Sequence, residues 1–334
     1  MYDIIVIGAG PAGCMTAKRI AETGHKVLLA EKMEFPREKS CSGILIKKSI
    51  QMVEAEFGKI PESVFSNPQI NQGIILTNED DQVFKFESEG YNIWRSSFDY
   101  WMAREAESSG ADLRTSTTAL SCKEEDDLVV VKFKNNIETA QVVIACDGAA
   151  SRIGRGLLNV SPDYIFTYQT FSRGTIDLDS QFFHAFLDPR LSQYDAWFNV
   201  KDDFLIMGVG VKNPSLMEKY HSRFVSFLKS HYNAHIESIV KTEVGIMPYI
   251  TPEFSFYLGK GRVLFAGEAA NLLNPLGEGI SSALASGYVA AEAIKFYENP
   301  DFMSDSYKNG LKSEIDYMIR QWKFLGEISP KFKY

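Results

Sequence analysis

Cysteine is scarce in this chain of 334 residues. Its four cysteines are Cys14, Cys41, Cys122 and Cys146, and no two of them stand at the C-x-x-C spacing of a redox pair or a zinc site. The sequence therefore argues against a disulfide framework and favours a reducing compartment. Cys41 stands alone in the stretch KSCSGILIKKS, residues 39–49, so its surroundings must explain it.

The sequence also lacks a net positive charge, long apolar runs and hydrolase motifs. A formal net charge of -8 offers no basis for binding nucleic acid. No apolar run approaches the roughly 20 residues that span a bilayer. Because the first strand begins at residue 2, we expect no signal peptide and a cytoplasmic protein. The five histidines form no H-E-x-x-H arrangement and G-x-S-x-G does not occur, so we expect neither a metal site nor a serine hydrolase.

The amino-terminal segment has the pattern of a dinucleotide-binding fold. The apolar run 3–7 predicts a central parallel strand, and the GAGPAG turn after it opens a helix. Gly8 allows the tight turn, Gly10 lets the backbone approach a pyrophosphate, and Gly13 lets the helix pack on the strand. The free N–H groups of the helix N-terminus favour an anion. A second strand ends at Glu31, where a carboxylate can accept hydrogen bonds from a ribose.

A second motif, KGRVLFAGEAANLLNPLGEGISSALASG at residues 260–287, indicates which dinucleotide binds. It predicts a strand followed by Gly267 and Glu268, then a loop, then a helix that opens at Gly279. An acid at the end of this strand is placed to bind a ribityl chain. The helix N-terminus favours the negative charge of a reduced isoalloxazine ring. The two motifs together predict FAD.

These two motifs and the CDG of VVIACDGAASRIGR resemble FAD-dependent oxidoreductases of the para-hydroxybenzoate hydroxylase fold. Within that fold, Cys41 together with NPLGEGISSALASG is most similar to the geranylgeranyl reductase family, which includes archaeal digeranylgeranylglycerophospholipid reductases. The resemblance implies a mixed α/β fold, with a Rossmann-like FAD-binding domain interwoven with an antiparallel substrate-binding sheet. We expect the FAD-binding domain at residues 1–65, 95–160 and 256–300, the substrate-binding domain at 66–94 and 161–255, and a helical segment at 301–334.

The resemblance also implies a set of positions that contact FAD. They are Gly8, Gly10, Ala12, Gly13, Glu31, Lys32, Cys41, Ser42, Arg95, Ala119, Asp147, Gly148, Gly267, Glu268, Pro275, Gly277, Gly279 and Ile280. In the family, the cysteine at the position of Cys41 lies near the isoalloxazine ring in the catalytic cavity, where a thiol packs without bringing a charge. The alternative for Cys41 is a buried filler on its loop.

The substrate region departs from the family pattern. The family shows Tyr-x-Trp-x-Phe-Pro before a glycine pair, whereas YDAWFNVKDDFLIMGVG keeps Trp197, Gly208 and Gly210 but has Tyr194 one position early. Glu268 likewise replaces the family's aspartate. Tyr194 and Trp197 are candidate catalytic residues lining the cavity, with Tyr194 a candidate proton donor. Both fit equally well as core aromatics.

The predicted function is an FAD-dependent oxidoreductase that passes hydride from reduced FAD to a C=C bond of an isoprenoid or other hydrophobic, lipid-like substrate. No separate nicotinamide fingerprint occurs, so NAD(P)H or another donor, including an external donor protein, would supply the electrons. One alternative is an aromatic or polyketide monooxygenase of the same fold. Another is an FAD-binding electron-transfer or regulatory module without its own substrate.

The last segment carries an apolar stripe at helical spacing. Its members are Leu311, Ile315, Met318, Trp322 and Leu325, with lysines and an arginine beside them. One interpretation is that the stripe packs on the FAD-binding domain. The alternative is a basic amphipathic helix that contacts a membrane surface.

Overall fold

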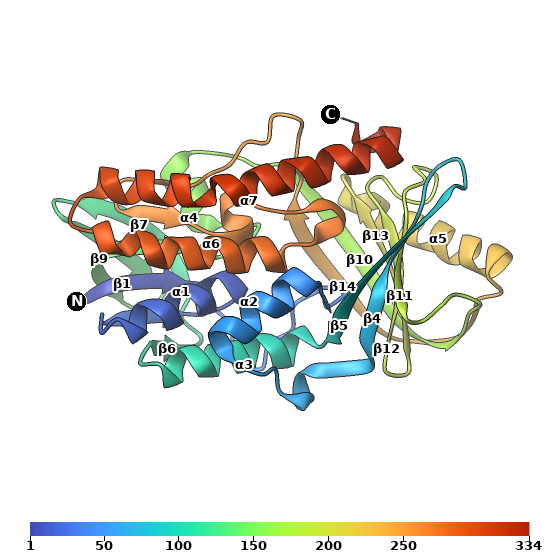
Figure 1. Ribbon diagram of the computed structural model, residues 1–334, viewed down its shortest axis with the longest axis horizontal. Helices are drawn as coiled ribbons and strands as arrows, with labels where there is room; N and C mark the ends of the chain where they lie inside the picture. Colours follow the sequence, from blue (N-terminus) through green and yellow to red (C-terminus); the bar gives the residue numbers. More distant parts are fainter. Residues whose placement is uncertain (334) are drawn as a thin grey trace.

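A computed structural model of the chain describes residues 1–333 and contains two eight-stranded sheets (Figure 1). The first sheet has the order β15-β16-β9-β1-β2-β6, and the hairpin of β7 and β8 continues from β9. Its strands are β1 (Tyr2–Ile7), β2 (Val27–Ala30), β6 (Asp112–Arg114), β7 (Ala119–Glu125), β8 (Leu128–Phe133), β9 (Ile137–Ala145), β15 (Gly259–Lys260) and β16 (Val263–Phe265). Strands β6, β2, β1, β9 and β16 are parallel. Strand β1 is buried almost throughout, which is why it reads as a nearly continuous apolar run.

The second sheet has the order β14-β10-β13-β12-β11-β4-β5-β3. Its strands are β3 (Ile44–Leu45), β4 (Phe65–Thr77), β5 (Val83–Ile93), β10 (Tyr164–Thr175), β11 (Phe182–Phe186), β12 (Ala196–Lys201), β13 (Phe204–Val211) and β14 (His235–Pro248). All its pairs are antiparallel except that of β11 with β4. The chain thus combines a parallel sheet with a largely antiparallel one, and the predicted mixed α/β fold class is confirmed.

Seven α-helices complete the described part of the chain, residues 1–333. They are α1 (Pro11–Glu22), α2 (Lys47–Phe57), α3 (Arg95–Ser108), α4 (Arg152–Leu158), α5 (Met217–His231), α6 (Ile280–Ala293) and α7 (Pro300–Ile328). Helix α1 contacts both α3 and α6. A side chain at Gly287 of α6 would collide with the backbone of Ala12, so this glycine permits the close approach of α1 and α6. The hydroxyl of Thr16 donates to the Gly287 carbonyl at 3.0 Å and fixes the contact.

The range 1–65 that we predicted for the FAD-binding domain includes a strand of the second sheet. Strand β3 lies inside the range 1–65, yet it pairs with β5 of the second sheet. The loop between β2 and β3, which carries Cys41, therefore passes from one sheet to the other. This passage brings the loop against one face of the second sheet, and α5 packs on the other face.

The apolar stripe of α7 is packed inside the protein. Leu311, Met318, Trp322 and Leu325 are buried, and Ile315 is partly buried. The indole Nε1 of Trp322 donates to the Leu273 carbonyl at 2.8 Å, and Figure 1 shows α7 lying along α6. The stripe therefore packs on the fold and is not available to a membrane surface. No helix within residues 1–333 combines the length and apolar character that crossing a membrane requires.

Candidate functional site

A cavity of about 520 Å³ is lined by residues from both sheets. On the first sheet it touches the β1–α1 turn and the segments that follow β2, β9 and β16. On the second sheet it touches β10, β11, β12 and β14. Ligands of α/β sheets bind beyond the carboxyl ends of the strands, and cavities of about 300–1,000 Å³ are usual for small molecules. The position and size of this cavity are therefore those of a cofactor and substrate site.

Most of the residues predicted for the site line this cavity. They are Gly8, Gly10, Ala12, Glu31, Lys32, Cys41, Ser42, Arg95, Ala119, Asp147, Gly148, Trp197, Gly267, Glu268, Gly277, Gly279 and Ile280. Gly13, Pro275 and Tyr194 lie outside its lining. Gly13 still has the packing role predicted for it, because a side chain there would collide with the Gly8 carbonyl.

The turn between β1 and α1 leaves room for a pyrophosphate. At Gly10, an added Cβ would meet nothing nearer than the Arg37 guanidinium at 3.8 Å, so the backbone is open to the cavity. Gly10 is also the N-cap of α1, and no side chain caps this helix. Its first N–H groups are therefore left for a ligand, and the positive end of the helix favours an anion. This cradle fits the pyrophosphate of FAD.

A chain of buried charges runs beside the turn. Glu31 Oε2 accepts from the Ala9 N–H at 3.0 Å and lies 3.3 Å from Arg37 Nε. Arg37 Nη2 is 3.0 Å from Asp99 Oδ2, and Asp99 also receives two hydrogen bonds from Arg95, at 2.8 and 2.9 Å. Burial by itself would raise the pKa of Asp99, but Arg95 and then Arg37 outweigh it and lower that pKa. The alternating charges join the predicted ribose-binding acid to the segment that carries Arg95.

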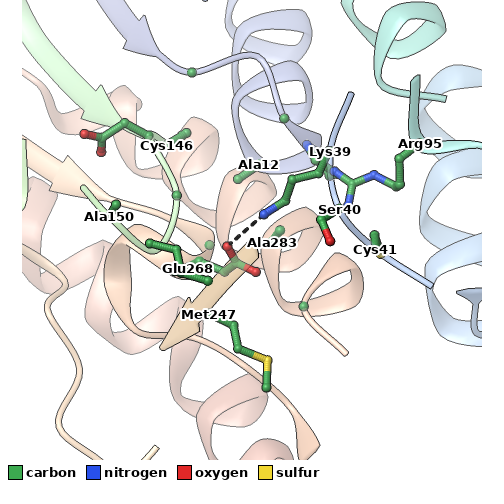
Figure 2. A pocket seen from close by; sticks show the side chains of 18 of the residues that line it. Ala12, Lys39, Ser40, Cys41, Arg95, Cys146, Ala150, Met247, Glu268 and Ala283 are labelled. Atoms are coloured by element: carbon green, nitrogen blue, oxygen red, sulfur yellow. Dashed lines mark ion pairs between the residues drawn. The ribbon is translucent and has the colours of Figure 1, made fainter. Parts of the chain in front are cut away.

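Cys41 lies at the end of this chain of charges. It is partly buried, it lines the cavity, and Figure 2 shows it close to Arg95. The Gly43 N–H donates to Cys41 Sγ at 3.3 Å, and the Arg95 guanidinium is within hydrogen-bonding reach of the thiol. Cys41 is thus placed on the cavity wall rather than in the core.

The retained glycine pair of the second sheet makes space for two cavity residues. A side chain at Gly208 would collide with the Trp197 ring, and a Cβ at Gly210 would lie 3.3 Å from Asp195 Oδ1. Trp197 and Asp195 both line the cavity, and Trp197 Nε1 donates to Gln169 Oε1 at 3.3 Å. Asp195 and Gln169 were not predicted from the sequence, although Asp195 occupies the position of the family's tyrosine.

Tyr194 belongs to the core instead of the cavity. Its ring packs edge-on against Phe332, with 5.3 Å between ring centres, and against Trp322 at 6.3 Å. Neighbouring residues of an extended segment point to opposite faces, so Asp195 faces the cavity and Tyr194 does not. This placement corrects the expectation that Tyr194 lines the cavity and leaves it as a core aromatic.

Acidic residues from the second motif and from the CDG segment reach the cavity from the first sheet. Figure 2 shows Glu268 facing Lys39, whose Nζ is 3.6 Å from Glu268 Oε2. Asp147 accepts from the Arg152 and Ile153 N–H groups at 2.8 and 3.3 Å and so caps α4. Lys39 was not predicted, because an ion pair between distant loops leaves no periodic pattern.

Comparison with known proteins agrees with this geometry. Residues 1–161 match the FAD binding domain family. Digeranylgeranylglycerophospholipid reductase 1 of Methanopyrus kandleri is 32% identical over 317 residues, which cover 90% of this chain and 82% of that protein. This chain belongs to the geranylgeranyl reductase family of FAD-dependent oxidoreductases. Its cofactor is FAD, as the two nucleotide-binding motifs predicted, and the recognition of the family from sequence is confirmed.

Other members and neighbours extend the comparison. The digeranylgeranylglycerophospholipid reductase of Methanocaldococcus jannaschii is 27% identical over 343 residues, 97% of this chain and 86% of that protein. A geranylgeranyl bacteriochlorophyll reductase-like protein of Thermoplasma acidophilum has a TM-score of 0.80 at 23% identity, covering 96% of this chain and 86% of that chain. The myxobacterial chondrochloren halogenase has a TM-score of 0.73 at 16% identity, and the match covers 96% of this chain and 82% of that chain. Both of these solved structures share the fold of the present chain.

Proposed function

We propose that this enzyme uses reduced FAD to saturate a C=C bond of an isoprenoid lipid. The observation that carries the proposal is the single cavity in which the FAD cradle, the Cys41 thiol and the apolar side chains of Phe183, Trp197 and Ile246 meet. An apolar wall beside the cofactor suits a hydrocarbon chain. Relatives of this chain carry the name digeranylgeranylglycerophospholipid reductase, and an isoprenoid lipid is accordingly the substrate class we assign.

The residues around the cavity divide the binding of FAD among them. The uncapped start of α1 would hold the pyrophosphate, Glu31 the adenosine ribose, and Glu268 with the start of α6 the ribityl and ring end. When bound, FAD accepts electrons from NAD(P)H or another reduced donor and supplies the hydride that the alkene receives. Cys41 and Arg95 would lie beside the ring.

Reduction of a C=C bond also needs a proton on the second carbon. Cys41 presents its thiol on the cavity wall, and Trp197 offers a flat apolar surface against which the substrate chain can pack. Asp195 is a second acid on the same wall, and burial raises its pKa to about 6, with Lys331 opposing the rise. We assign proton delivery to Cys41 because its thiol lines the cavity beside the position proposed for the ring.

We expect the purified protein to be yellow, with noncovalent FAD, and Glu31→Gln to weaken FAD binding about tenfold or more. The change replaces a charged acceptor of the ribose hydroxyls with a weaker neutral one, which costs roughly 1.5–3 kcal/mol. Glu34→Gln is the matched control, since Glu34 is on the same loop but outside the cavity lining and bonds Thr115 at 2.9 Å. Flavin fluorescence titration measures both affinities. Equal affinities would contradict the assignment of Glu31.

The proposed reaction can be tested by reducing the enzyme without oxygen and adding acceptors one at a time. We expect an isoprenoid alkene to reoxidise the flavin and to gain two hydrogens, as seen by absorbance at 450 nm and mass spectrometry. Oxygen should reoxidise the flavin without entering an organic product. Labelled oxygen found stoichiometrically in an aromatic product would instead establish a monooxygenase.

A further inference from the structure

A row of directly opposite residues crosses four strands of the second sheet on the face that borders the cavity. Trp197 on β12 lies opposite Gly208 on β13. Gln169 on β10 lies opposite Gly208 on one side and opposite Glu243 of β14 on the other. Trp197 and Gln169 both line the cavity and are 8% and 1% exposed. A Cβ at Gly208 would lie 2.1 Å from the Trp197 ring, so the indole lies across this glycine and reaches Gln169.

The side-chain amide of Gln169 binds the residue on either side of it in this row. Its Oε1 accepts from Trp197 Nε1 at 3.3 Å, and its Nε2 donates to Glu243 Oε2 at 2.8 Å. An indole N–H can only donate, and a carboxylate can only accept. The amide therefore satisfies both partners in one orientation, with its carbonyl toward the indole and its NH2 toward the carboxylate. Glu243 orients Gln169, and Gln169 in turn holds the Trp197 ring.

The carboxylate of Glu243 is itself held in place. Its Oε1 is 2.8 Å from the Nζ atom of Lys241, which lies two residues away on the same face of β14. Lys241 Nζ is also 2.8 Å from Glu38 Oε2 and lies 5.4 Å from the centre of the Phe171 ring. Both oxygens of Glu243 are thus engaged, one by Lys241 and the other by Gln169, which limits the orientations open to the Gln169 amide.

Gln169 also reaches the loop that carries the thiol. Its Nε2 makes a long hydrogen bond of 3.5 Å to the Cys41 carbonyl oxygen. Asn199, two residues after Trp197 on β12, donates to the Ser42 carbonyl at 3.4 Å and holds the same loop. Because the loop has this second attachment to the sheet, loss of the Gln169 amide should disturb the Trp197 ring more than it disturbs the thiol.

We propose that Gln169 is a positioning residue that acts through Trp197 and determines the shape of the cavity wall that binds the isoprenoid chain. A hydrocarbon chain offers no acceptor to an indole N–H, so the protein must supply one to avoid a buried unpaired donor. The bond to Gln169 does so, and the rest of the ring presents only carbon to the substrate. A ring held in one orientation also reduces the ordering that substrate binding requires. The inference rests on the proposed function.

The first test observes the indole directly and needs no substrate. Isotope labelling of the tryptophans gives each one an indole N–H signal in NMR, and Trp197→Phe identifies the signal of Trp197. In Gln169→Leu with FAD bound, we expect this signal to shift and its hydrogen exchange to become about tenfold faster, because the acceptor is gone. The signals of the other tryptophans should stay in place. Gln72→Leu, which removes the bond between the exposed Gln72 and Gln181 at 2.6 Å, is the matched control and should leave every signal unchanged.

The second test measures the reduction of an isoprenoid alkene with FAD in excess. Gln169→Leu should raise KM about tenfold and leave kcat within about twofold of the parental value, since the wall binds the chain but does not carry the chemistry. Trp197→Phe keeps an aromatic ring without the N–H, so adding Gln169→Leu to it should raise KM by less than about twofold more. A general loosening of the sheet would instead raise KM equally in both backgrounds. Gln72→Leu should keep the parental KM and kcat.

The outcomes distinguish this inference from the proposed function. An unchanged Trp197 signal in Gln169→Leu, or an equal rise in KM with and without Trp197→Phe, overturns the role of Gln169, while alkene reduction by the parent would still stand. If Gln169→Leu does not fold, Trp197→Phe decides, because a parental KM in that variant also overturns the role. A parent that never reduces an alkene defeats the proposed function, and the indole signal then decides alone on whether Gln169 holds Trp197.

Discussion

Arg95→Met should lower the free energy of unfolding by about 3 kcal/mol and release much of the bound FAD. Removing one partner of a buried ion pair typically costs about 3–5 kcal/mol, because the other charge is left buried without compensation. Asp99 is 0% exposed and would keep only Arg37, at 3.0 Å. Because the pair of Asp99 with Arg37 remains, we expect the loss of unfolding free energy to lie at the lower end of that range. Arg95 also lines the cavity, so FAD would lose the contacts that this side chain offers.

Arg104→Met is the matched control for this change. Arg104 is in the same helix, α3, and pairs with Glu107 three residues on, but the two side chains are 55% and 37% exposed. Exposed pairs contribute about 0–1 kcal/mol. Urea denaturation with FAD held at constant excess compares the two variants. Similar losses in both would show that the buried chain of charges does not stabilise the fold.

The pH dependence of this stabilisation has a definite sign. Arg95 and Arg37 hold the pKa of Asp99 below its ordinary value of 3.8, despite burial. The folded state therefore favours the carboxylate, and the stabilisation is present above about pH 4 and is lost as pH falls through the lowered pKa. The unfolding free energies of Arg95→Met and the parent should accordingly converge in acid.

The parts of the site that follow from local spacing could be predicted from the sequence. Gly8, Gly10 and Glu31 belong to one strand, turn and helix unit, in which each position has a role fixed by the backbone path. Asp99 joins that unit only through the packing of α3 on α1, and Arg37 joins it through the path of the loop that follows β2. Charged residues at such separations carry no periodic pattern, so neither of them was predicted.

The substrate side shows why strand register limits prediction. Trp197 lines the cavity, but whether Tyr194 or Asp195 does so depends on which of these two neighbours points inward. A shift of one residue along a strand exchanges the two faces. Lys201 shares the face of Trp197 by the same alternation, and the sequence gives no sign that the loop of Cys41 packs against it.

Cys41→Ala should give the largest loss of activity, about a hundredfold in kcat, with the fold and FAD content preserved. General acids typically contribute about 10²–10⁴ to a rate, and alanine has no proton to deliver. The thiol is partly buried on a cavity wall, so its removal leaves no closed void in the core. Cys122→Ala is the control, because Cys122 is also partly buried but lies on β7 outside the cavity lining.

Cys41→Ser separates proton delivery from packing. Serine keeps an acceptor for the Gly43 N–H and for Arg95, so the melting temperature should stay close to that of the parent. Its hydroxyl is a much weaker acid than a thiol, so kcat should remain near the low value of Cys41→Ala. A core filler would behave in the opposite way, because a buried hydroxyl without a partner costs about 1–3 kcal/mol while turnover per bound flavin stays unchanged. A serine variant that melts earlier and turns over normally would thus remove Cys41 from the proton path.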